Sequence, residues 1–219
     1  NLAQFWDGRA ADLEEQASGP INNHVEMGSN WAEVIGKLRR DPQYPALFAA
    51  LYRDGITAAA IQNALAEFEH SLITINSPFD RYLQGDEKAI NTEARQGYAL
   101  FQSYGCIACH QGRNVGGNLF QKMGAVGNYF KDRGNIQKVD LGRYNVTGRQ
   151  ADMHYFKVPS LRLAALGGPY FHDGSATTLD SAILTMGRYQ LGREIPPSDR
   201  RKIQAFLKSL VGEHRLLKK

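Results

Sequence analysis

The sequence is short of cysteine and of long apolar runs, and each shortage excludes a class of protein. Only two cysteines, Cys106 and Cys109, occur among the 219 residues. A structural zinc ribbon needs a second cysteine pair and is therefore excluded. No apolar run approaches the ~18 residues that indicate a membrane-spanning helix, so no membrane span is expected.

Charge of one sign is not concentrated anywhere in the chain either. The net charge is +4, and the basic residues are scattered rather than clustered, so a nucleic-acid partner is not expected. An apolar content of 42% is typical of a globular protein. The sequence opens at Asn1 without the basic and apolar leader of a secretory signal peptide.

The two cysteines lie in the run Cys106-Ile107-Ala108-Cys109-His110, close to the middle of the chain. A C-x-x-C-H run is the pattern of covalent c-type haem attachment. Its two thiols reach the two vinyl groups of one porphyrin, and the next residue is placed to bind the iron. We therefore predict one haem c, with Cys106 and Cys109 as thioether anchors and His110 as proximal ligand. A dithiol redox pair is the alternative, but it has no use for the histidine.

His110 would occupy only one face of the iron, and the sequence holds several candidate ligands for the other face. The candidates are the methionines Met27, Met123, Met153 and Met186 and the five other histidines. Met186 is favoured because it follows a long glycine-rich segment, residues 111–174, that is expected to wrap the haem. A methionine is more often a gap-filling core residue than a ligand. With Met186 bound, the iron passes electrons and has no open position for peroxide.

Helical periodicity dominates the remainder, so the predicted fold class is mainly α with long loops. Capping residues and apolar spacing predict helices over residues 30–41, 46–52, 58–73, 90–101 and 198–210. Ser198 is the predicted cap of the last helix, and Asn76-Ser77-Pro78 is predicted to stop the third. The helices before and after the haem motif are expected to cross at Gly97, under Phe206, because glycine permits close approach.

Several further stretches are distributed almost end to end along the chain. They include Phe5-Trp6-Asp7-Gly8-Arg9-Ala10, Phe79-Asp80-Arg81-Tyr82-Leu83, Phe156-Lys157-Val158-Pro159-Ser160-Leu161-Arg162 and Tyr170-Phe171-His172-Asp173-Gly174. Together with the haem motif they resemble the bacterial di-haem cytochrome c peroxidases. The resemblance implies that residues 86–219 form a cytochrome c-like, high-potential haem domain with a C-terminal helix. Residues 1–85 would be the helical remainder of an N-terminal, peroxidatic cytochrome c-like domain.

The resemblance also implies roles for individual residues. Trp6 resembles a tryptophan that lies between the two haems of the family, and Glu26 resembles its distal acid–base glutamate. Gly167 and Pro169 resemble backbone-carbonyl ligands of a calcium ion. The second haem of the family has no motif in this sequence, so it is expected on an N-terminal segment that this sequence does not contain. His172 is expected to be structural rather than a ligand.

The function that the resemblance implies is reduction of hydrogen peroxide to water by a cytochrome c peroxidase. This chain would carry the electron-accepting His/Met haem. The expected partners are a small c-type cytochrome or copper protein as electron donor, the N-terminal haem segment, and a second copy of the chain in a homodimer. Covalent haem attachment implies export to the periplasm, with a leader that has been removed or lies outside this sequence.

Two alternatives stay open at this point. One is a single-haem electron carrier without catalysis. The other is a related tryptophan-modifying di-haem oxidase, in which a tyrosine replaces the distal methionine. Met186 argues against that oxidase, whereas the nearby Tyr189 keeps it open.

Overall fold

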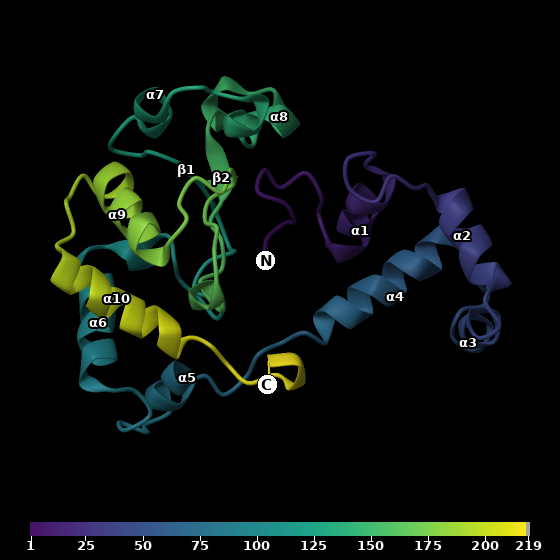
Figure 1. The fold of residues 1–219 in the computed structure, drawn as a ribbon, viewed down its shortest axis with the longest axis horizontal. Coiled ribbons are helices and arrows are strands. Elements are labelled where there is room, and N and C mark those ends of the chain that lie inside the picture. The colour runs from purple at the N-terminus through teal and green to yellow at the C-terminus, as the bar shows by residue number, and fades with distance from the viewer. Residues whose placement is uncertain (218–219) are drawn as a thin grey trace. The chain divides into compact units, whose positions relative to one another are not determined.

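The computed structural model describes residues 1–217 and is built mainly of helices, which confirms the predicted fold class (Figure 1). The chain divides into two compact units. The helical unit consists of residues 10–73, and the motif unit consists of residues 1–9 and the chain from Thr74 onward. Among residues 1–217, no helix has the length and apolar character needed to cross a membrane.

The helical unit ends at Ile73, whereas the sequence predicts a domain boundary between residues 85 and 86. Phe79 packs edge-on against Phe206, with 5.0 Å between the ring centroids, and this contact joins residues 74–85 to the motif unit. The assignment of residues 1–85 as the helical remainder of an N-terminal peroxidatic domain stays a prediction.

Four helices form the helical unit: α1 (Leu13–Asn22), α2 (Trp31–Arg40), α3 (Tyr44–Leu51) and α4 (Ala58–His70). As predicted, the side chains of Asn30 and Thr57 cap α2 and α4 by accepting hydrogen bonds from backbone N–H groups. The core contains Phe48, Ile56, Ala60 and Ile61. α4 ends at His70, earlier than predicted, because the exposed Leu72 and Ile73 add nothing to this core.

The motif unit contains the longer helices α6 (Thr92–Ser103), α9 (Leu179–Gln190) and α10 (Pro197–Ser209). Its shorter elements are α5 (Pro78–Leu83), α7 (Tyr129–Arg133), α8 (Tyr144–Thr147), the strands β1 (Phe120–Lys122) and β2 (Tyr155–Lys157), and the 3-10 turns η1 (Cys106–Ala108), η2 (Lys138–Leu141), η3 (Gln150–Asp152), η4 (Ala164–Leu166) and η5 (Arg215–Leu217). The predicted irregular segment, residues 111–174, therefore holds only short elements.

The crossing of α6 and α10 organises the core of the motif unit, as predicted. Gly97 is buried at this crossing, and a Cβ atom placed on it would lie 1.9 Å from the carbonyl oxygen of Lys202. The residue over Gly97 is thus Lys202 rather than the predicted Phe206, whose ring packs instead on Tyr98 and Phe101 at centroid distances of 5.2 and 5.1 Å. Only glycine allows the two backbones to come this close.

The predicted cap of α10 is wrong by two residues. Pro196 is the N-cap, Pro197 is the first helical residue, and Ser198 lies inside the first turn. Proline suits the first helical position because its φ is already fixed near the helical value and its missing N–H would have had no partner there. Ser77 shows the usual arrangement at α5, where it and Asp80 form a reciprocal capping box.

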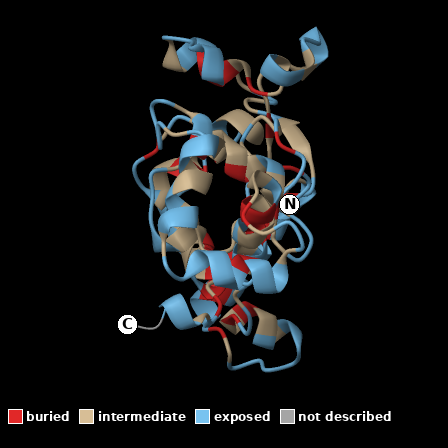
Figure 2. Ribbon diagram, turned by 90° about the vertical axis from the view of Figure 1, so that its right-hand side faces the viewer, coloured by how far each residue is buried: buried red, intermediate tan, exposed pale blue. Residues whose placement is uncertain are grey.

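Strands β1 and β2 form a short antiparallel ribbon in which Phe120 pairs with Lys157 and Lys122 with Tyr155. A second cluster of buried residues, Tyr129, Phe130 and Phe156, lies beside this ribbon. Burial is therefore shared among separate clusters along the described chain (Figure 2). Short elements and aromatic contacts replace long helices in this part of the motif unit.

Candidate haem site

The C-x-x-C-H run forms one tight turn directly after α6. Gly105, at φ +89°, lets the chain reverse, and Cys106 begins the turn η1. The backbone N–H of His110 donates to the carbonyl oxygen of Cys106 at 2.9 Å, which holds the histidine beside the two cysteines. Neither cysteine is in a disulfide. The turn thus presents two thiols and an imidazole together.

The imidazole of His110 is oriented by backbone carbonyl groups. Its Nδ1 lies 3.3 Å from the carbonyl oxygen of Val115, where it can act only as donor. A Cβ atom on Gly116 would lie 3.3 Å from this Nδ1 and 2.1 Å from the carbonyl oxygen of Pro159, so a side chain at position 116 would obstruct the contact. A proton on Nδ1 leaves Nε2 as the free ligand atom.

Burial lowers the pKa of His110, although the carbonyl groups of Val115 and Pro159 oppose this shift. The neutral imidazole that burial favours is the form that binds a metal. Burial also raises the pKa of Cys106 to about 11, because this thiol packs against the α6–α10 core. Cys109 accepts a long hydrogen bond, 3.8 Å, from Gln121 Nε2. The donor set and its surroundings fit an attached haem c.

Met186 lies on α9, a helix that the sequence analysis did not predict. Its neighbours one turn away on the same helix are both packed. Ile183 belongs to the α6–α10 core, and the ring of Tyr189 packs edge-on against Tyr129 at 5.2 Å. Residues three apart share a helix face, so α9 holds Met186 between two anchored side chains. Tyr189, the candidate ligand of the alternative oxidase, is engaged in this aromatic contact.

The two residues assigned to catalysis by resemblance lie in different units. Trp6 belongs to the motif unit, is 37% exposed, and accepts a hydrogen bond on its carbonyl oxygen from the Lys157 backbone N–H at 2.8 Å. Glu26 belongs to the helical unit, in an exposed turn after α1. There Asn23 Nδ2 donates to the Glu26 carboxylate at 2.7 Å. Gly167 and Pro169 lie in an exposed turn after η4.

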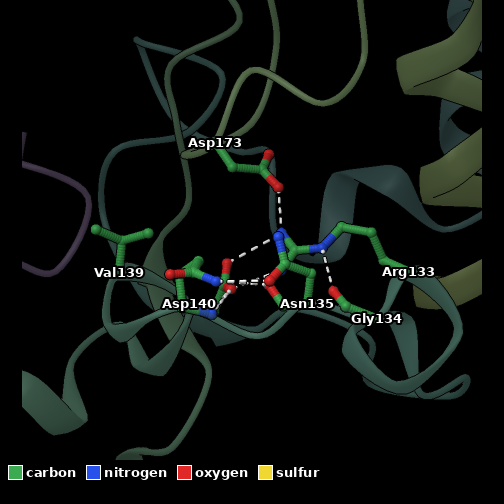
Figure 3. A pocket seen from close by; sticks show the side chains of 7 residues that line it. Arg133, Gly134, Asn135, Val139, Asp140 and Asp173 are labelled. Atoms are coloured by element: carbon green, nitrogen blue, oxygen red, sulfur yellow. Dashed lines mark hydrogen bonds and ion pairs between the residues drawn. The ribbon is translucent and has the colours of Figure 1, made fainter.

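A buried ion-pair network, which the sequence analysis missed, joins three loops of the motif unit. Arg133 forms ion pairs with both Asp140 and Asp173 (Figure 3). His172 Nε2 lies 2.6 Å from Asp140 Oδ1, which also accepts from Arg133 at 3.0 Å, and the His172 ring stacks on Phe156 at 4.3 Å. His172 thus belongs to the ion-pair network, and its assignment as structural rather than a ligand stays a prediction.

This network borders a pocket of ≈ 360 Å³ that is lined mainly by the α7–η2 loop. Burial on its own would raise the pKa of Asp140, but hydrogen bonds from Arg133, the Gln137 N–H and His172 outweigh it and keep this pKa well below its usual range. Asp140, His172 and Asp173 could together face a metal ion. The guanidinium of Arg133 already pairs with both carboxylates, so the cluster is an ion-pair network rather than a cation site.

The sequence is similar to known cytochrome c peroxidases. The sequence profile of the di-haem cytochrome c peroxidases matches residues 1–88. Cytochrome c peroxidase Ccp of Escherichia coli (strain K12) is 46% identical over 213 residues, which are 97% of this chain and 45% of that protein. Cytochrome c551 peroxidase of Nitrosomonas europaea is 47% identical over 214 residues, 97% of this chain and 63% of that protein.

The fold has a relative among solved structures. A MauG-like protein associated with microbial copper homeostasis superimposes with a TM-score of 0.84 at 25% identity, covering 97% of this chain and 72% of that one. Among the sequence relatives, the chain spans 45% of the length of the Escherichia coli peroxidase and 63% of the length of the Nitrosomonas europaea peroxidase.

Proposed function

Because this chain belongs to the di-haem cytochrome c peroxidase family, we propose that it is the electron-accepting portion of an enzyme that reduces hydrogen peroxide to water. The observation that carries the proposal is the turn in which His110, backed by the Val115 carbonyl at 3.3 Å, follows two free thiols. Haem c supplies reversible one-electron chemistry at its iron. The protein supplies attachment, orientation and the choice of axial ligands.

Each residue of the proposed centre has a separate task. Cys106 and Cys109 would hold the porphyrin, and His110 would bind the iron through Nε2 because its Nδ1 donates to the Val115 carbonyl oxygen. Met186 is the proposed sixth ligand, supported by its position between two packed residues of α9. Held by His110 and Met186, the haem would supply electron transfer and would leave no position for peroxide.

Peroxide reduction itself is proposed to occur at a second haem on an upstream segment. Glu26 would move protons there as an acid–base group, and Trp6 would lie on the route of the electrons. We propose a periplasmic location, a small cytochrome or copper protein as electron donor, and a homodimer as the assembly. A calcium ion bound by carbonyl groups of Gly167 and Pro169 completes the proposal, since calcium favours oxygen ligands.

The MauG-like relative favours a second candidate, the tryptophan-modifying oxidase. That reading requires a tyrosine as distal ligand. Tyr189 packs instead on Tyr129, and 46–47% identity to two cytochrome c peroxidases supports the peroxidase more strongly. A single-haem carrier without catalysis would leave Glu26 without a task.

Exchanging Met186 tests the proposed ligand set. Met186→His should keep a six-coordinate iron but lower its reduction potential by on the order of 0.1–0.3 V, within the ~0.8 V range that axial ligands span, because imidazole stabilises ferric iron better than a thioether does. Met186→Ala should remove the thioether-to-iron absorption band. Met123→Leu and Met153→Leu are the matched controls and should leave the spectrum unchanged. Persistence of the band in Met186→Ala would mean that another residue is the ligand.

A further inference from the structure

The N-terminal segment, residues 1–9, runs along the β ribbon of the motif unit and is fastened to it. The Leu2 N–H donates to the Gly117 carbonyl oxygen at 2.6 Å, and the Lys157 N–H donates to the Trp6 carbonyl oxygen at 2.8 Å. The backbone of Trp6 is therefore fixed beside β2, while its indole is 37% exposed.

Lys157 holds the same segment a second time through its side chain. Its Nζ donates to the carbonyl oxygen of Ala3 at 2.9 Å. Burial lowers the pKa of Lys157, and among residues 1–217 no carboxylate lies within ion-pair distance of it. A partly buried ammonium with a single carbonyl partner is costly unless that contact is kept. The ammonium group of Lys157 therefore has its hydrogen-bond partner in residues 1–9.

The attachment point of Trp6 is connected to the proximal ligand. Three hydrogen bonds and the short backbone stretches 157–158 and 115–117 make a continuous bonded connection. From the surface inward, the bonds are Lys157 N–H to Trp6 O at 2.8 Å, Gly117 N–H to Val158 O at 2.7 Å, and His110 Nδ1–H to Val115 O at 3.3 Å. The connection ends on the imidazole that is proposed to bind the iron.

Resting on the proposed function, we infer that Lys157 is a positioning residue for electron transfer, because its side chain fastens residues 1–9 at Ala3 and so keeps Trp6 at the outer end of this connection to His110. The step that this positioning would serve is the passage of one electron from the haem held at His110 to the haem of the proposed upstream segment. No bond breaks and no proton moves with it. Lys157 would act only by holding the segment that carries Trp6.

The test uses Lys157→Met, which removes the ammonium but keeps the length of the stem. Since the chain has two tryptophans, Trp6 and Trp31, a Trp31→Phe background isolates the emission of Trp6. Lys157→Met removes the Nζ bond to Ala3 and leaves the backbone N–H bond to the Trp6 carbonyl oxygen. In the haem-loaded protein the release of Ala3 should loosen the segment around Trp6, so that the indole spends time farther from the quenching haem and Trp6 emission rises several-fold. The second readout uses the longer protein that also carries the proposed upstream haem segment, here called the two-haem protein. In it, electron transfer between the haems should slow by roughly tenfold to a hundredfold, the size of effect that small misplacements of positioned groups have on rates.

Lys122→Met is the matched control, since Lys122 is an exposed lysine on the partner strand. It should leave both readouts at the parental value, and Lys157→Arg should largely restore them. The potential and the thioether absorption band should stay unchanged throughout, which separates loss of positioning from loss of folding. Parental emission in Lys157→Met, or raised emission with an unchanged transfer rate, would overturn the inference.

The outcome also separates this inference from the proposed function on which it rests. If the parent two-haem protein reduces no peroxide, the proposed function fails. The emission of Trp6 still reports whether Lys157 holds it, because that measurement needs only the haem-loaded chain. Parental emission in the variant overturns the inference in that case as well.

Discussion

Replacing Glu26 with glutamine in the two-haem protein is expected to lower peroxide turnover by roughly two to four orders of magnitude, the usual contribution of a positioned acid–base group. Glutamine keeps the size of the side chain and can still accept the hydrogen bond that Asn23 Nδ2 donates at 2.7 Å. It cannot carry the proton that peroxide cleavage requires. Steady-state peroxide reduction with a reduced small cytochrome as donor measures the loss.

Glu33→Gln supplies the control for Glu26→Gln. Glu33 is another exposed glutamate of the helical unit, paired with Lys37 on α2 at 2.7 Å, and its variant should turn over at the parental rate. The 219-residue chain alone should exchange electrons with the donor yet show negligible turnover, because it holds a single C-x-x-C-H run. Efficient turnover by the chain alone would contradict this division of roles, and parental turnover in Glu26→Gln would remove the acid–base assignment.

Gly97→Val is expected to destabilise the motif unit by roughly 3 kcal/mol or more, at or beyond the upper end of ordinary overpacking. A Cβ atom at position 97 would lie 1.9 Å from the Lys202 carbonyl oxygen and 3.0 Å from the Ile203 nitrogen. Because both neighbours are backbone atoms of α10, no side-chain rotation relieves the clash and the helices must separate. The midpoint of unfolding in urea, followed by circular dichroism, measures the loss.

Gly36→Ala is the control for Gly97→Val. Gly36 is also inside a helix, α2, but a Cβ there would meet nothing closer than an Arg40 side-chain nitrogen at 3.6 Å. Alanine should therefore stabilise that helix by about 0.5–1 kcal/mol. Unchanged stability in Gly97→Val would mean that α6 and α10 do not cross closely in solution.

The haem motif and the helix crossing could be predicted because each leaves a pattern of side chains. Cys106, Cys109 and His110 have a spacing that few other sites use. Gly97 lies in the apolar stripe of a predicted helix, and glycine is unfavourable inside a helix unless close packing requires it. The caps Asn30 and Thr57 were also readable, since their side-chain oxygens satisfy free N–H groups at helix starts.

Other parts of the site left no such pattern. The carbonyl oxygen that orients His110 belongs to Val115, and a backbone group can be supplied by any residue type. The network of Arg133, Asp140, His172 and Asp173 joins residues up to 40 positions apart, and only the folded loops bring them together. The start of α10 was missed because two consecutive prolines, at 196 and 197, fix the backbone there more strongly than Ser198 does.

The most direct test of the central claim is the mass of the haem-loaded 219-residue chain under denaturing conditions, combined with its haem-to-polypeptide ratio. One haem per chain is expected, and it should remain attached after unfolding because two thioether bonds would hold it at Cys106 and Cys109. A polypeptide that loses its haem on denaturation, or that never carries one, would show that the C-x-x-C-H turn is not a haem c attachment site.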